Sequence, residues 1–144
     1  MIYLDSSSLL KLLWSEPESP AVVDAIAAEN TVLVSVLAEL ETLVQLKAAY
    51  LGGDYSLPRL RRLEAQLAVL RNQPPYEFRT LSGTVFQTAL RQHRNSGNRH
   101  SRSLDRLHLA AMEELKVTRL MTNDGNQSKA AVTAGFEVVS PGCD

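Results

Sequence analysis

The sequence has very little cysteine and no long apolar run. Cys143 is the only cysteine among 144 residues. A single thiol excludes a disulfide framework and a zinc site built from several thiolates, and it fits a reducing compartment. No apolar stretch is long enough to span a bilayer, and no basic segment followed by an apolar stretch marks a secretory signal. We therefore expect a cytoplasmic protein with no membrane association.

Several common catalytic patterns are also missing. The chain contains no Gly-x-Ser-x-Gly sequence and no glycine-rich phosphate loop. His93, His100 and His108 lack the spacing of metal ligands with one another. His108 lies in a segment rich in alanine and leucine, which is more typical of a packed structural histidine than of a ligand. The sequence thus gives no support for a nucleophilic serine enzyme or a histidine metal centre.

Net charge is close to zero, but the basic residues are clustered. The formal charge of −1 excludes a polycation. The segment 91–106 nevertheless carries five arginines and two histidines against Asp105, and a second basic cluster is formed by Arg59, Arg61 and Arg62. A solvated loop and helix surface explains these clusters as well as a phosphate-contacting rim does. Within the first segment, Arg99, Arg102 and Arg106 are the candidates for contacts with a nucleic acid backbone.

The stretch on which the fold prediction depends is the N-terminal MIYLDSSS. Residues 2–4 form a short apolar run of strand-forming residues, and Asp5 ends it. Three serines and a leucine-rich segment follow, which indicates a buried strand leading into a helix, with Asp5 or a serine as its N-cap. In an open α/β sheet, polar groups just beyond the carboxyl ends of the strands line the binding crevice. We expect Asp5 at that place.

The rest of the chain alternates between apolar β-branched runs and helical patterns. We expect strands at residues 2–4, 31–35, 76–81, 119–122 and 136–139. We expect helices from residue 6 to 13 and at residues 19–29, 36–51, 58–70, 82–92, 104–115 and 127–134. This alternation predicts one α/β domain, residues 1–144, with a parallel sheet and helices on both faces.

Four acidic residues are candidates for one site, although each has an ordinary explanation. Asp5 follows the first strand and could be only a helix cap. Asp105 lies in the first turn of a helix, where the helix dipole stabilises an acid. Asp124 lies in an Asn-Asp-Gly turn after a strand, where acids are common.

Glu41 is the fourth candidate and lies within the helix predicted at 36–51. At 100° per residue, Leu37, Glu41 and Val44 share one face of this helix. Burying a lone carboxylate is costly, so an acid in an apolar stripe is unusual. Glu39 lies nearly opposite, and we expect Glu39 on the surface and Glu41 facing inward.

Together, the four acids predict a cation site. Two carboxylates about 4 Å apart repel each other by ~4 kcal/mol at an effective dielectric constant near 20. Converging carboxylates must therefore take up protons or bind a cation. Oxygen ligands that leave coordination positions to water suit Mg²⁺ or Mn²⁺.

The motifs around these acids resemble those of the PIN-domain family, and within it the VapC-type toxins of bacterial toxin–antitoxin pairs. The matching segments are Ile2–Ser7, Ser35–Glu41, Leu104–Ala111 and Thr122–Asp124. The spacing from Ser35 places the second family acid at Glu41. The chain departs from the family pattern at Arg106, where a small residue is common, and at Gln127, where an apolar residue is common.

The resemblance implies a three-layer α/β/α fold with a mostly parallel five-stranded sheet of order 3-2-1-4-5. It also implies an endoribonuclease dependent on Mg²⁺ or Mn²⁺ that acts on single-stranded or loop regions of structured RNA, such as tRNA or rRNA. An antitoxin protein and a homodimer are the implied partners. Ser6, Ser7 and Thr122 are candidates to orient the carboxylates or waters.

As a mechanism, we hypothesise that Asp5, Glu41, Asp105 and Asp124 bind one or two ions and that an activated water attacks the phosphorus. The products would be 5′-phosphate and 3′-hydroxyl ends.

Two other functions remain open on the sequence, and Ser7 argues against a third. The chain could be a non-catalytic module that binds RNA or a protein partner, or a solitary nuclease that processes RNA without an antitoxin. A haloacid-dehalogenase-like phosphatase would need a second aspartate two residues after its nucleophile, where this chain has Ser7.

Overall fold

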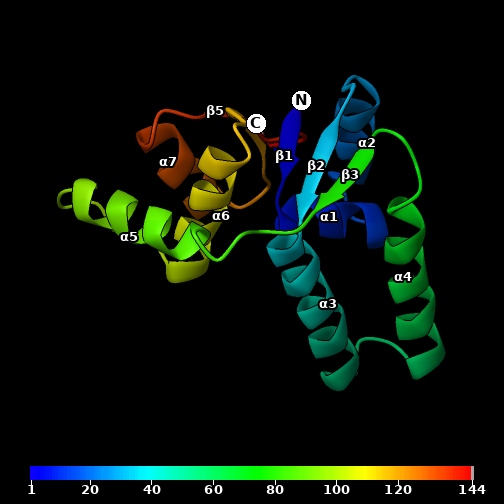
Figure 1. The fold of residues 1–144 in the computed structure, drawn as a ribbon. Helices are drawn as coiled ribbons and strands as arrows, with labels where there is room; N and C mark the ends of the chain where they lie inside the picture. Colours follow the sequence, from blue (N-terminus) through cyan, green and yellow to red (C-terminus); the bar gives the residue numbers. More distant parts are fainter. Residues whose placement is uncertain (144) are drawn as a thin grey trace.

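A computed structural model, which describes residues 1–143, shows a five-stranded parallel sheet in the order β3-β2-β1-β4-β5 (Figure 1). The strands are β1 (Ile2–Leu4), β2 (Val32–Ser35), β3 (Tyr76–Arg79), β4 (Arg119–Met121) and β5 (Glu137–Val139). All four strand pairs are parallel, with Tyr3 opposite both Leu33 and Leu120. The predicted fold class and strand order are confirmed.

Seven helices connect the strands within the described residues. They are α1 (Ser6–Leu13), α2 (Ser19–Ala27), α3 (Val36–Leu51), α4 (Leu57–Leu70), α5 (Val85–Asn95), α6 (Ser103–Glu114) and α7 (Gly125–Thr133). The predicted bounds differ by a few residues, most at α5, which begins and ends three residues later than expected. No described helix is both long enough and apolar enough to cross a membrane.

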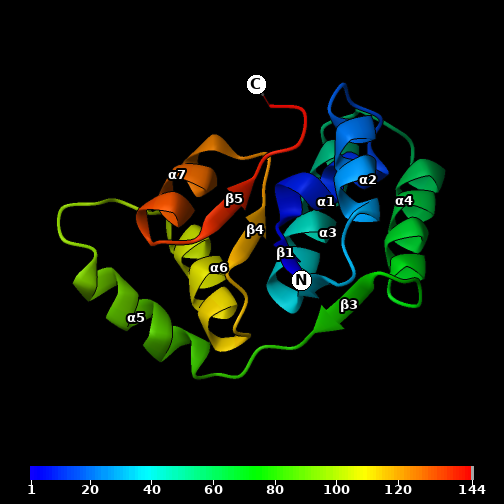
Figure 2. The same ribbon diagram turned by 90° about the horizontal axis from the view of Figure 1, so that it is seen from above.

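The sheet lies between helices α1 to α4 and helices α5 to α7 (Figure 2). It separates two apolar cores, and the residues of β1 alternate between them. Ile2 and Leu4 pack with α1 to α4 on one side, whereas Tyr3 faces α5, α6 and α7 on the other. All three β1 residues are fully buried, as expected for a central strand covered on both faces. Leu9, Leu10 and Leu13 of α1 pack into the first core.

The predicted inward face of α3 is wrong. Ala38, Thr42 and Leu46 are the buried residues of this helix. Leu40 and Val44, which flank or share the predicted stripe, are more than half exposed. Both sides of α3 are apolar in sequence, so hydrophobicity alone could not decide between them. The carboxyl end of β2 continues directly into α3, and this junction sets which side faces the sheet.

Candidate active site

Asp5 lies at the carboxyl end of the central strand and begins α1. Its Oδ1 accepts hydrogen bonds from the Ser8 N–H (3.2 Å) and the Ser7 hydroxyl (2.7 Å), and its Oδ2 accepts from the Thr122 hydroxyl. Asp5 is only 4% exposed. Burial raises its pKa, and the hydrogen bonds from Thr122 and Ser7 oppose this only in part. The structure thus fixes a desolvated carboxylate at the middle of the sheet edge.

Asp105 and Asp124 are held together by one guanidinium group. Arg102 donates from Nε to Asp105 Oδ2 (2.7 Å) and from Nη2 to Asp124 Oδ2 (2.8 Å). Asp124 is also the N-cap of α7, accepting from the Asn126 N–H (2.8 Å). Burial would raise the pKa of Asp124, but the hydrogen bonds from Arg102 and from backbone N–H groups outweigh it and leave the pKa lowered. These two acids are therefore paired with a cation supplied by the chain.

Glu41 faces α6, where it contacts His108 Nε2. His108 is buried, and its Nδ1 lies 2.7 Å from the Tyr3 hydroxyl, which lies 2.6 Å from the Ser35 hydroxyl. A carboxylate only accepts hydrogen bonds, so His108 donates from Nε2 to Glu41, and Nδ1 accepts from Tyr3. Ser6 adds a long hydrogen bond of 3.4 Å to Glu41. Glu39 instead pairs with Arg71 at the surface.

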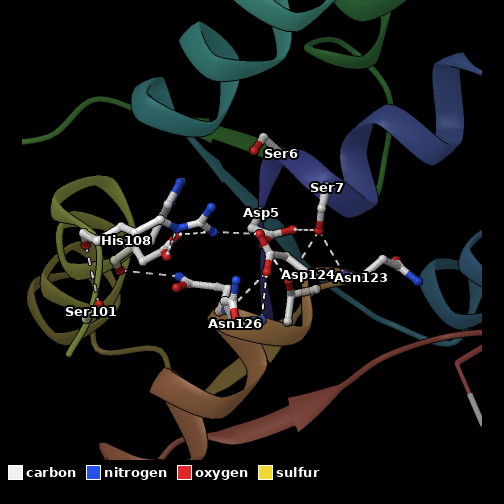
Figure 3. A network of polar contacts seen from close by, with 12 residues as sticks. Asp5, Ser6, Ser7, Ser101, His108, Asn123, Asp124 and Asn126 are labelled. Carbon is white, nitrogen blue, oxygen red and sulfur yellow. Dashed lines mark hydrogen bonds and ion pairs between the residues drawn. The ribbon is translucent and has the colours of Figure 1, made fainter. Parts of the chain in front are cut away.

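At the carboxyl edge of the sheet, Glu41 is held separately by His108 and Ser6, whereas Arg102 and Thr122 connect the other three acids, Asp5, Asp105 and Asp124, in one polar network (Figure 3). Thr122 joins two of them, because its hydroxyl donates to Asp5 and accepts from the Asp124 N–H (3.1 Å). Asp105 and His108 lie on the same face of α6, three residues apart. Among residues 1–143, however, no three Asp, Glu, His or Cys side chains come close enough to hold a metal ion jointly.

The donor set nevertheless suits a hard divalent cation. The acids contribute carboxylate oxygens only, which is the chemistry that Mg²⁺ and Mn²⁺ prefer. The guanidinium of Arg102 bridges two carboxylates and so already marks a cation-binding position between α6 and α7. A divalent ion at Asp105 and Asp124 therefore requires Arg102 to leave.

The three arginines predicted to contact RNA have different environments. Arg102 binds the acids, as described above. Arg99 donates to the Thr133 carbonyl (3.3 Å) on α7. Arg106 is half-buried between α5 and α6. All three line one cleft beside Asp105.

The prediction of His108 as a packed residue is confirmed by its burial, but sequence reasoning missed its contact with Glu41 and the contribution of Asn123. Asn123 accepts from the Ser8 hydroxyl (2.7 Å), and its N–H donates to the Ser7 hydroxyl (2.9 Å), which ties β4 to α1 beside Asp5. The position of His108 one helical turn after Asp105 was the available signal, because residues three apart share a helix face. At Gln127 the family pattern has an apolar residue. Gln127 is nevertheless fully buried, and its side chain donates to the Asp105 carbonyl (3.3 Å), so a polar contact holds α7 against α6.

Residues 2–132 match the family described as PIN domain, and the chain belongs to this family. Relatives from Mycobacterium tuberculosis extend this likeness over nearly the full length. Ribonuclease VapC46 is 32% identical over 142 residues, covering 97% of both chains. Ribonuclease VapC47 is 32% identical over 148 residues, covering 99% of this chain and 98% of the relative. The relatives found are therefore VapC ribonucleases, as the motifs suggested.

Solved structures agree on the fold. The M. tuberculosis toxin VapC20, described as cleaving the sarcin-ricin loop, superposes with a TM-score of 0.73 at 17% identity, over 98% of this chain and all of that one. VapBC2 from Rickettsia felis, bound to a DNA fragment from its promoter, gives a TM-score of 0.67 at 15% identity, over 96% of this chain and 98% of that one. At these identities the likeness concerns the fold alone.

Proposed function

We propose that this single-domain chain is a cytoplasmic endoribonuclease toxin of the VapC type, dependent on Mg²⁺ or Mn²⁺. The observation that carries the proposal is the group of acids at the carboxyl edge of the sheet. There Asp5 is desolvated, and beside it Asp105 and Asp124 share the guanidinium of Arg102. Similarity to ribonucleases over nearly the whole chain supports the reaction class. Structured RNA such as tRNA or rRNA is the proposed substrate.

In the proposed mechanism the four acids would hold one or two divalent ions, and the surrounding groups would orient the carboxylates. Ser7 and Thr122 fix both oxygens of Asp5, while His108 orients Glu41. Asp105 and Asp124 offer their oxygens once Arg102 moves away. When bound, a divalent ion would lower the pKa of a water and stabilise charge on the departing 3′ oxygen. The RNA phosphodiester would be hydrolysed to 5′-phosphate and 3′-hydroxyl ends.

An antitoxin protein and a second copy of the chain are the proposed partners. The first rests on the similarity to VapC toxins and to the fold of VapBC2. Light scattering on the purified chain tests the dimer, since a mass of about one chain, 15.9 kDa, contradicts it.

The test of the proposed function is cleavage of total tRNA and rRNA by the wild type and by Asp5→Asn. The asparagine keeps the volume and the helix cap but removes the charge. We expect discrete fragments from the wild type with Mg²⁺ or Mn²⁺, none with EDTA, and at least a hundredfold slower cleavage by the variant. Equal cleavage by both proteins would falsify the proposed role of Asp5.

A non-catalytic RNA-binding module is the second candidate, because Arg102 and His108 already occupy three of the four carboxylates. RNA binding by a folded wild type that never cleaves, with either ion present, favours this candidate.

A further inference from the structure

The cleft between α5, α6 and α7 contains positive charge that the proposed reaction does not use. Its volume is about 680 Å³, and Asp105 forms part of its wall. Five arginine and lysine side chains line it against two carboxylates. One of these acids, Glu113, is paired with Arg91, and the other, Asp105, is paired with Arg102.

Arg106 is the unusual member of this group. Its Nε is enclosed by protein and has no hydrogen-bond partner, and Nη1 makes only a marginal contact of 3.5 Å with the Gln92 side-chain oxygen. No acid among the described residues forms an ion pair with it. A partly desolvated guanidinium without an anion is costly, so its presence here indicates a missing anionic partner.

Two more cations face the same space without an acidic partner among residues 1–143. Arg99 reaches only the Thr133 carbonyl, and Lys129 lines the cleft from α7. The three come from the loop before α6, from α6 and from α7, so they surround the cleft. Planar guanidinium groups bind phosphate oxygens through paired N–H donors.

We propose that this cleft binds a phosphate of the RNA next to the one that is cleaved, with Arg106 as its main contact. Arg106 directly follows Asp105 in α6, so a phosphate held by Arg106 lies close to the acids at the carboxyl edge of the sheet. The inference rests on the proposed ribonuclease function and extends it, because it separates the three arginines by role: Arg106 and Arg99 hold the substrate, and Arg102 holds the acids.

The experiment compares wild type with Arg106→Gln and, as a control, Lys47→Gln, which removes an exposed cation of α3 that lies outside both basic clusters. Binding of a fluorescent single-stranded 12-nucleotide RNA is measured in EDTA, so that no cleavage occurs, across a range of salt concentrations. Each phosphate contact to a single strand contributes about 0.7 to the slope of log K against log salt. We expect Arg106→Gln to lose several-fold in affinity and ~0.7 in slope, while Lys47→Gln matches the wild type.

A second variant and a second probe keep the outcome clear if Arg106→Gln folds poorly. Arg106→Lys retains the charge but not the planar fork, and we expect its affinity to fall between those of wild type and Arg106→Gln. Pyrophosphate is titrated while the arginine Nε–H resonances are followed by NMR, with the Arg106 signal assigned from its loss in the variants. We expect this signal to shift at saturable concentrations.

Two outcomes overturn the proposal. If RNA binds and is cleaved but Arg106 variants match Lys47→Gln in affinity and slope, the cleft does not hold RNA while the ribonuclease function stands. If pyrophosphate shifts the Arg106 signal but RNA neither binds nor is cleaved, the anion site exists and its ligand is a free phosphate compound. In that case both the assignment of the cleft to RNA and the proposed ribonuclease function are wrong.

Discussion

At the scale of single residues, two of the four acids have a structural as well as a proposed chemical role. Asp5 caps α1, and Asp124 caps α7. In sequence, a capping aspartate and a ligand aspartate after a strand look the same, because both need a carboxylate at the strand-to-helix junction. The motifs located these acids correctly at the edge, but their chemical roles remain a prediction.

Arg102 is expected to compete with divalent ions for Asp105 and Asp124. A bound ion must displace two ion pairs, each worth about 0.2–1 kcal/mol for a guanidinium that is 55% exposed. Arg102→Gln should therefore bind Mn²⁺ a few-fold more tightly than the wild type, as measured by isothermal titration calorimetry.

Arg99→Gln is the control for the loss of a nearby positive charge, because Arg99 donates to a backbone carbonyl and not to the acids. Its affinity for Mn²⁺ should stay within twofold of the wild type. Weaker Mn²⁺ binding by Arg102→Gln would mean that the guanidinium orients the two carboxylates instead of competing for them.

The position of Glu41 follows from its motif, whereas the partner that holds it does not. Motif spacing from Ser35 selected Glu41 over Glu39, and the structure places Glu41 against His108 and Glu39 against Arg71. The helical-wheel argument for the same choice was wrong, since the stripe around Glu41 is exposed. The contacts of His108 were missed because its partners come from β1 and α3, and only the folded chain brings these elements to α6.

At the scale of secondary structure elements, strands and helices followed their local patterns closely. Short β-branched runs and cap residues such as Ser35, which accepts from the Ala38 N–H (3.2 Å), define most boundaries. The start of α5 was placed three residues early, at Ser82. Ser82 resembles a helix cap in sequence, but its carbonyl accepts from the Val85 N–H (3.1 Å) in a turn that precedes the helix.

His108 joins three elements, and its removal should affect stability more than its size suggests. His108→Ala leaves the Tyr3 hydroxyl and Glu41 without their buried partner, and an unsatisfied buried polar group costs about 1–3 kcal/mol. We expect at least that loss in the free energy of unfolding, measured by urea denaturation in EDTA.

His93→Ala, at an exposed position on α5, is the matched control and should change stability by less than about 0.5 kcal/mol. A double-mutant cycle with Tyr3→Phe isolates the contact between the two side chains. We expect a coupling energy of about 0.5–3 kcal/mol. Additive losses would show that His108 acts only through its volume.

At the scale of the whole molecule, both cores meet the sheet beneath Asp5, which accounts for the desolvation of this acid. Its pKa in the folded state is raised above the ordinary value near 3.9. The folded state then binds the proton more tightly than the unfolded state, so stability falls as pH rises from about 3.9 through the folded-state pKa. At neutral pH the charge of Asp5 therefore destabilises the fold.

Asp5→Asn should consequently be more stable than the wild type at pH 7, with a difference that shrinks as pH falls towards 4. Urea midpoints measured in EDTA at several pH values test this. Asp54→Asn changes an exposed acid and should show no such trend. A variant that is less stable than the wild type at every pH would show that the hydrogen bonds of the carboxylate outweigh its desolvation.

The strand order has a consequence for synthesis. The central strand is made first, but its neighbour β4 and the acid that follows it come from residues 119–124. Since chains emerge from the ribosome N-terminus first, the edge that carries Asp5 lacks Asp124 until residues 119–124 have been made. The proposed four-acid site therefore forms only after that segment has been translated, later than the central strand at which it is built.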